Sequence, residues 1–197
     1  MQLPDKGRGL RLLDIGCGTG ASTAALLSVA PHAEIVAADG SAGMLSQAKA
    51  KQWPPTVTFV HSRAEGLADA GVEGPFDGIL AAYLVRNLSD PDPVLQTLRA
   101  LLSPGAVFAA HEYSVQDSRW ATAVWNAVSS AVIIPAGRMR SGDASLYRYL
   151  RRSVNDFDGV TKFRERLQHN GFTDVKSLTM PGWQHNIVHT FLGRAPR

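Results

Sequence analysis

Two kinds of hydrophobic pattern alternate along the chain. Short runs rich in Leu, Ile, Val and Ala alternate with segments in which apolar residues recur every three or four positions. The runs are typical of parallel strands buried on both faces, and the segments between them are typical of the helices that cover such strands. The chain is therefore predicted to form an α/β, Rossmann-like fold with a seven-stranded, mostly parallel sheet and helices on both faces. The predicted strands are residues 10–15, 34–38, 56–60, 78–83, 106–111, 173–179 and 186–193, and the helices between them are residues 21–29, 42–51, 94–102 and 160–169.

Residues 115–156 interrupt this alternation. A mostly apolar stretch predicts a helix over 120–134 that stops at Pro135, and a second helix is predicted over 143–154. In open α/β sheets, ligands bind beyond the carboxyl ends of the strands, which is where a segment leaving the fifth strand lies. We therefore expect a single domain, residues 1–197, in which residues 115–156 form a helical lid. An extra surface helix pair is the alternative.

A glycine-rich turn joins the first predicted strand to the first helix. Gly16, Gly18 and Gly20 lack Cβ atoms, so a flat ligand can approach the backbone closely, and the free N–H groups of the following helix face that ligand. Asp14 precedes the turn and no basic residue accompanies it, which suits the cationic amino-acid end of a ligand better than a diphosphate. Cys17 is best interpreted as a small residue that fills the turn.

A second acid, Asp39, ends the next predicted strand. An acid at this place in the fold accepts hydrogen bonds from ribose hydroxyls. The spacing of Asp14 and Asp39 therefore predicts a nucleoside site with an amino-acid end, and the alternative is an ordinary α/β turn with a surface aspartate.

Composition excludes several classes of protein. With 45% hydrophobic and 19% charged residues, the chain is globular and not disordered, and its single cysteine excludes a disulfide scaffold. Residues 1–9 lack the apolar core of a signal peptide and no apolar run of 18 residues occurs, so we expect a cytoplasmic protein. The net charge of +3 comes with no base-reading motif, so no nucleic-acid partner is expected. His61, His185 and His189 lack metal-ligand spacing, so no metal is predicted.

The motif from Asp14 to Gly20 resembles the first motif of the class I S-adenosylmethionine (SAM) methyltransferases. The resemblance implies that SAM is the cofactor, that the glycine turn passes under its methionine part, and that Asp39 holds both ribose hydroxyls. The cofactor-binding residues expected on this basis are Asp14, Gly16, Cys17, Gly18, Gly20, Asp39, Gly40, Met44, Ala64, Glu65 and Ala81.

Segments further along the chain resemble one particular family of these methyltransferases. The Arg86-Asn87 pair after the fourth strand, Glu112-x-Ser114 after the fifth and the segment 169–172 are similar to the ubiquinone/menaquinone-biosynthesis C-methyltransferase family. The likeness runs from about residue 10 to residue 193. It implies methyl transfer to a ring carbon of a prenylated quinol, a small lipophilic acceptor.

The chain departs from that family at three places. The family's N-terminal signature segment is absent, and its Lys-Pro-Gly-Gly is replaced by the residues at 103–106. Arg63 stands where many members place an acid near the adenine. Because an arginine cannot accept a hydrogen bond from the adenine amine, adenine recognition falls to Glu65 or to the backbone.

Four residues are candidates for the chemistry. Ionising a phenol of pKa about 10 at pH 7 costs roughly 4 kcal/mol, and a nearby cation offsets part of that cost. Arg86 is the expected cation, and Asn87 would orient the ring. Tyr83 and His111 lie at strand ends where a base is useful. The alternatives are a surface ion pair of Arg86 with Asp90, a packed Tyr83 ring and a merely structural histidine.

Basic and aromatic side chains gather in the predicted lid. They favour, at most, peripheral contact with an anionic membrane, and a solvated basic face is the alternative. A homodimer is also left open. Two other functions remain in view, O- or N-methylation of another small metabolite and a non-catalytic SAM-binding scaffold. The side chains concerned are Trp120, Trp125, Arg138, Arg140, Arg148, Arg151 and Arg152.

Overall fold

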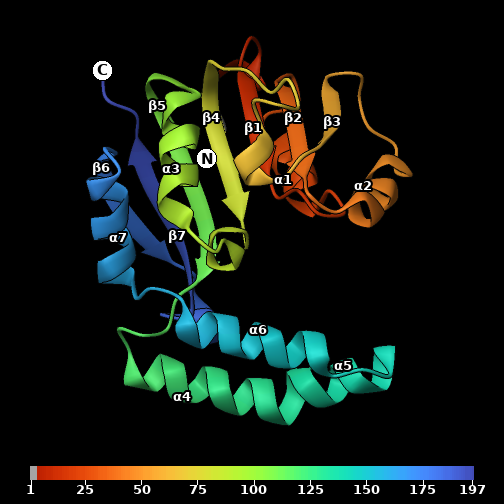
Figure 1. Ribbon diagram of the computed structural model, residues 1–197, viewed down its shortest axis with the longest axis vertical. Helices are drawn as coiled ribbons and strands as arrows, with labels where there is room; N and C mark the ends of the chain where they lie inside the picture. The colour runs from red at the N-terminus through yellow and green to blue at the C-terminus, as the bar shows by residue number, and fades with distance from the viewer. Residues whose placement is uncertain (1–3) are drawn as a thin grey trace.

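The computed structural model describes residues 4–197, and the side chains of Pro4, Arg140 and Ser141 lie outside that description. Seven strands form one sheet in the order β3-β2-β1-β4-β5-β7-β6, parallel from β3 to β5, with β7 antiparallel to both of its neighbours (Figure 1). The predicted fold class is confirmed. The strands and helices are β1 (Arg11–Ile15), α1 (Ala21–Val29), β2 (Glu34–Asp39), α2 (Ala42–Lys49), β3 (Val57–His61), β4 (Phe76–Ala82), α3 (Pro91–Ala100), β5 (Leu102–Tyr113), α4 (Arg119–Val128), α5 (Ile134–Ser141), α6 (Ser145–Asp156), α7 (Val160–His169), β6 (Thr173–Thr179) and β7 (Val188–Arg194).

The third helix and the fifth strand begin earlier than predicted. Helix α3 starts at Pro91 because the side chain of Asp90 accepts a hydrogen bond from the backbone N–H of Asp92, and proline is tolerated in the first turn. Strand β5 starts at Leu102 and runs through the predicted Pro-Gly break, since the β4–β5 register shifts there between Phe76 and Gly78. The irregularity is absorbed inside the strand.

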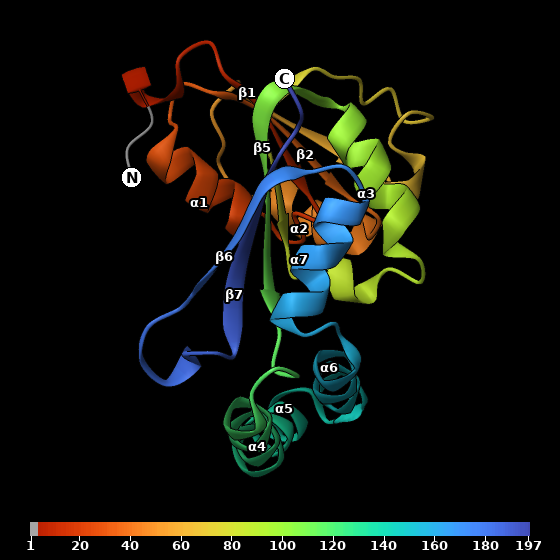
Figure 2. The ribbon, with the colours of Figure 1, turned by 90° about the vertical axis from the view of Figure 1, so that its left-hand side faces the viewer.

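Helices pack on both faces of the sheet. Figure 2 shows α3 and α7 on one side and α1 on the other. The α7 face holds the main core, in which Phe76, Phe108, Phe163 and Phe191 are fully buried. This apolar layer fixes the carboxyl ends of β1, β4 and β5 as one rigid edge, and the candidate site lies along that edge.

The helical insertion differs from its prediction at Pro135. The helix does not stop there: α4 continues through a π-helical turn, Ser129–Ile133, into α5. Pro135 lies in the first turn of α5, and a π turn just before it widens the helix where the proline cannot donate a hydrogen bond. Figure 1 shows α4, α5 and α6 beyond the arrowheads of β4 and β5, at the edge where ligands of such sheets bind.

The two connections of this insertion are tied to each other. The Ser114 hydroxyl donates to the carbonyl oxygen of Asp158 at 2.8 Å, and the Gln116 amide donates to the carbonyl oxygen of Asn155 at 2.8 Å. Trp125 of α4, only 1% exposed, is the largest side chain of a separate small core beneath the insertion. The two ends of the insertion therefore lie side by side, and its helices share a small core with Tyr113 of β5 and Val188 of β7.

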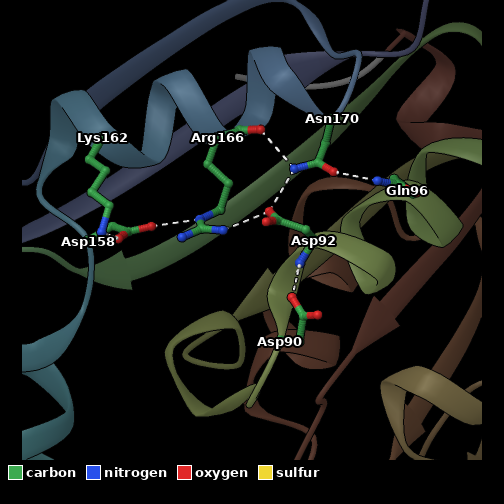
Figure 3. Close-up of polar contacts among 7 residues, drawn as sticks. All are labelled: Asp90, Asp92, Gln96, Asp158, Lys162, Arg166 and Asn170. Atoms are coloured by element: carbon green, nitrogen blue, oxygen red, sulfur yellow. Dashed lines mark hydrogen bonds and ion pairs between the residues drawn. The ribbon is translucent and has the colours of Figure 1, made fainter.

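A polar cluster fastens α7 to the start of α3 and to the end of the insertion (Figure 3). The Arg166 guanidinium contacts Asp158 and Asp92, each at 2.7 Å, and the amide of Asn170 donates to Asp92 at 2.8 Å. The hydrogen bond from Arg166 lowers the pKa of Asp92. Burial raises the pKa of Asp158, and hydrogen bonds from Arg166 and Lys162 more than offset that effect, so both carboxylates stay ionised.

Candidate active site

The glycine turn after β1 has the backbone geometry that its sequence predicts. Gly16, Gly18 and Gly20 have φ values of +74°, +55° and +87°, a region that other residues rarely adopt. A Cβ atom at Gly20 would lie 2.7 Å from the Trp53 ring, and one at Gly16 would lie 3.1 Å from Leu84. Trp53 and Leu84 pack so closely against the turn that only glycine fits at these two positions.

Asp39 joins the turn to the end of β2. One carboxylate oxygen accepts a hydrogen bond from the Gly18 backbone N–H at 2.8 Å, and the other accepts one from the Ser41 N–H at 2.7 Å. The Gly16 N–H donates to the Ala38 carbonyl oxygen at 2.8 Å. Carboxylate, turn and strand end therefore form one preorganised unit.

A cleft of about 370 Å³ opens beside this unit. It brings together predicted cofactor residues from three βα turns, and it also contains Asn87 and the unusual Arg63. The lining residues are Ile15, Gly16, Asp39, Gly40, Ser41, Ser62, Arg63, Ala64, Glu65, Leu84, Asn87, Leu88 and Ser89.

Other predicted cofactor residues do not line the cleft. Asp14 is fully buried, and one of its oxygens accepts hydrogen bonds from the hydroxyls of Ser22 at 2.8 Å and Thr23 at 2.6 Å. Its carboxylate therefore holds the first turn of α1 and does not face the open cleft. Ala81 is also fully buried. Burial raises the pKa of the Cys17 thiol to about 12, so the thiol stays protonated and Cys17 fills space.

Met44 lies beside the glycine turn without closing it. Its side chain is 48% exposed, and its sulfur would lie 3.5 Å from a Cβ atom at Gly18. The thioether can therefore cover a ligand on the turn from the side of α2. Contact of Met44 with the cofactor stays a prediction.

Asp14 gives the site a pH-dependent stability. Burial raises its pKa from 3.8 to about 6, so the folded protein holds a proton that the unfolded chain releases. This contribution to stability is complete below pH 3.8 and is lost as the pH rises through 6. The difference in free energy of unfolding between Asp14→Asn and the parent should therefore depend on pH. We expect it to be about 2–3 kcal/mol more in favour of the variant at pH 7 than at pH 4. Urea titrations at both pH values measure this gain, with the exposed Asp69→Asn as control, and an equal difference at both would contradict it.

Arg86 and Glu112 form a buried ion pair outside this cleft, and Arg86 lines a separate cavity of about 310 Å³. The guanidinium contacts the carboxylate at 2.7 Å, with side-chain exposures of 9% and 0%. The other carboxylate oxygen accepts a hydrogen bond from the Arg86 backbone N–H at 3.4 Å. The proposed surface pair of Arg86 with Asp90 is wrong, because Asp90 caps α3 instead.

Tyr83, Asn87 and His111 lie around this pair. The rings of Tyr83 and His111 meet edge to face at 5.2 Å, and His111 Nδ1 lies 2.8 Å from the Thr190 hydroxyl. Burial lowers the pKa of His111, so its imidazole is neutral near pH 7. Burial raises the pKa of Tyr83 to about 12, so Tyr83 donates hydrogen bonds and does not act as a base.

Asn87 connects the cleft to the helical insertion. Its amide nitrogen donates to the Tyr83 carbonyl oxygen at 2.8 Å, and its amide oxygen accepts a hydrogen bond from the hydroxyl of Tyr149 on α6 at 3.1 Å. The contact between Tyr149 and Asn87 could not be predicted, because nothing local links positions 62 residues apart.

Tyr113 also belongs to this end of the site and was not predicted. Its ring lies 5.1 Å from that of Tyr83, and Arg86 lies 5.8 Å from its centroid. The alternation of side chains along a strand could have shown it, since His111 and Tyr113 are two positions apart on β5 and share a face.

The site fits SAM on the evidence of its own geometry. A glycine turn of this kind can pass under a flat ligand, and the Asp39 carboxylate can accept hydrogen bonds from a ribose. Sheet, turn and cleft together define a class I SAM-dependent methyltransferase.

A model of the ubiE/COQ5 methyltransferase family matches residues 1–187, and the chain belongs to that family. The ubiquinone/menaquinone biosynthesis C-methyltransferase UbiE of Bradyrhizobium diazoefficiens is 31% identical over 185 residues, which are 91% of this chain and 72% of that protein. The demethylmenaquinone methyltransferase of Thermus thermophilus is 29% identical over 163 residues, 83% of this chain and 74% of that protein.

Solved structures share the fold at lower identity. The CurJ carbon methyltransferase superposes with a TM-score of 0.70 at 22% identity over 97% of this chain, which spans half of that structure. The plantazolicin methyltransferase BpumL, solved in complex with SAH, has a TM-score of 0.69 at 15% identity over 95% of this chain and 76% of that one. The chain is thus a SAM-dependent methyltransferase by family and by fold.

No helix within residues 4–197 is both long and apolar enough to cross a membrane. Within the same residues, no three His, Cys, Asp or Glu side chains are grouped so that they could hold a metal ion.

Proposed function

We propose that the protein transfers the methyl group of SAM to a ring carbon of a prenylated quinol. The relatives named above are a ubiquinone/menaquinone C-methyltransferase and a demethylmenaquinone methyltransferase, and their acceptors are quinone precursors by name. One observation carries the proposal for this chain: Glu112 fixes the cation Arg86 beside the rings of Tyr83 and Tyr113, and the neutral His111 contacts the Tyr83 ring.

Arg86 and His111 have complementary roles in this proposal. When bound, SAM supplies an electrophilic methyl group on a sulfonium. His111 takes the hydroxyl proton of the acceptor on Nε2, in the tautomer whose Nδ1–H donates to the Thr190 hydroxyl. Arg86 stabilises the phenolate that results. Its Nε has no partner among the described residues, while Glu112 engages the Nη1 atom and keeps the guanidinium in place.

As the ring carbon bonds to the methyl group, the bond from that group to sulfur breaks and leaves a neutral thioether. The same ring carbon then loses its own proton to solvent, and His111 returns the hydroxyl proton, so one proton is released for each methyl group transferred.

The helical insertion, residues 115–156, serves as the lid over the acceptor. Tyr149 of α6 supports this role, because it bonds to Asn87, which lines the cofactor cleft. Closing such a lid removes water from the site, which strengthens the interaction of Arg86 with a phenolate.

The outer surface of the lid suits contact with a membrane that holds a lipophilic acceptor. Trp120, Met139 and Leu146 are 75%, 89% and 65% exposed, and Trp183 on the β6–β7 loop is 60% exposed. Exposed apolar side chains beside arginines are typical of surfaces that bind anionic lipids. Sedimentation with vesicles of anionic and of neutral lipid tests this contact, and light scattering tests whether the same surface forms a homodimer instead.

Turnover with a reduced, prenylated naphthoquinol tests the function. We expect the product to gain one methyl group by mass spectrometry and to lose one ring-proton signal by NMR. A new methoxy signal would establish O-methylation instead. SAM binding by calorimetry without turnover of any quinol or other small acceptor would support a binding scaffold.

A further inference from the structure

Arg63 lines the cofactor cleft, and no other residue among 4–197 engages its guanidinium in a hydrogen bond or an ion pair. The backbone beneath this exposed side chain is held in place. The Arg63 carbonyl oxygen accepts hydrogen bonds from the Ser62 hydroxyl at 2.8 Å and from the Gly66 N–H at 3.1 Å. A free cation on a fixed backbone is therefore available to a ligand in the cleft.

The lack of a side chain at Gly40 lets Arg63 lie close to Asp39. A Cβ atom at Gly40 would lie 3.1 Å from the Cγ atom of Arg63, so the stem of the arginine packs directly against the Gly40 backbone. The Ser62 N–H donates to the Asp39 carbonyl oxygen at 3.1 Å, which holds the end of β3 beside the end of β2. The arginine side chain therefore starts next to the carboxylate that can bind a ribose.

The order of the strands directs the base of the cofactor toward Arg63. Strands β1, β2 and β3 lie side by side in that order (Figure 1). The glycine turn follows β1 and Asp39 ends β2, so a nucleoside with its amino-acid end on the turn and its ribose on Asp39 extends its base toward the end of β3. The cleft residues there are Ser62, Arg63, Ala64 and Glu65, of which only the two charged ones are exposed. The base therefore meets one cation and one carboxylate.

We propose that Arg63 is a specificity residue for the cofactor, which donates hydrogen bonds to ring nitrogens of the adenine base. A guanidinium carries only donors, so it cannot bind the exocyclic amine, whereas N1, N3 and N7 of the ring are acceptors. The carboxylate of Glu65 is the matching acceptor for the amine. The two side chains thus bind the two kinds of polar group on the edge of the base. This role goes beyond the proposed function, because it does not depend on the identity of the methyl acceptor.

Calorimetry with S-adenosylhomocysteine tests this role without turnover and without the sulfonium charge of SAM. Arg63→Met keeps the stem of the side chain and loses the donors, and we expect it to bind S-adenosylhomocysteine about tenfold more weakly than the parent. Arg164→Met removes an exposed arginine of α7 that does not line the cleft, and it should bind as the parent does.

Ligand analogues test the contact on the unaltered protein. In three analogues of S-adenosylhomocysteine, a C–H group replaces N1, N3 or N7 of the base. We expect the parent to bind at least one analogue about tenfold more weakly than S-adenosylhomocysteine, and Arg63→Met to bind that analogue and S-adenosylhomocysteine within about twofold of each other.

Three results would overturn the inference. The first is equal affinity of Arg63→Met and the parent for S-adenosylhomocysteine. The second is a loss on the analogue that persists in Arg63→Met, because the nitrogen would then be bound by another group. The third is equal binding of all three analogues and S-adenosylhomocysteine by the parent, because Arg63 would then act by stacking or by charge alone.

Discussion

Replacing Arg86 by alanine is expected to lower the free energy of unfolding by about 3–5 kcal/mol, because Glu112 would remain in the core without its counter-charge. Glu112 has no exposed surface, and burial already raises its pKa. Turnover should also fall, while SAM affinity measured by calorimetry on the folded fraction should stay within about twofold, since Arg86 does not line the cofactor cleft. Urea titration gives the stability.

A double variant separates the structural from the chemical role of this pair. Arg86→Met with Glu112→Leu removes both charges together, and such replacements are often neutral for stability. We expect this variant to regain most of the lost stability and to remain inactive. Recovered activity would show that Arg86 acts on folding alone, and a loss below about 1 kcal/mol for Arg86→Ala would show that the pair behaves as a surface link.

Asp39→Ala is expected to weaken SAM binding by about 1–3 kcal/mol, or roughly five- to 150-fold. The substitution removes the acceptor for a ribose, and it also leaves the N–H groups of Gly18 and Ser41 without the carboxylate that orders the turn. Calorimetry with SAM and with S-adenosylhomocysteine measures the loss.

Two further variants control this prediction. Asp39→Asn keeps one oxygen acceptor and should lose less affinity than the alanine variant. Asp69→Ala removes an exposed acid elsewhere and should bind SAM as the parent does. Equal affinity of Asp39→Ala and the parent would contradict the ribose role.

The cofactor half of the site could be predicted because its signals are local. The glycine turn fixes its own φ values, and Asp39 follows from the end of the adjacent strand, so both depend on short stretches of chain. The side-chain direction of Asp14 could not be predicted, since it depends on whether Ser22 and Thr23 turn back toward it.

The acceptor half depends on contacts between distant residues. Arg86 and Glu112 are 26 residues apart, and Tyr149 and Asn87 are 62 apart, so strand register and insertion packing decide these contacts. The continuation of the helix through Pro135 has a similar cause, because a π turn is set by packing and has no sequence signal of its own.

The joined ends of the helical insertion have an evolutionary consequence. Because Ser114 and Asp158 are hydrogen-bonded neighbours, an insertion of another length or sequence could leave the sheet and return to it at the same two residues. The nucleoside half of the enzyme would keep its geometry after such an exchange. Acceptor specificity could therefore change in evolution by replacement of this one segment, while the residues that bind the methyl donor stay the same.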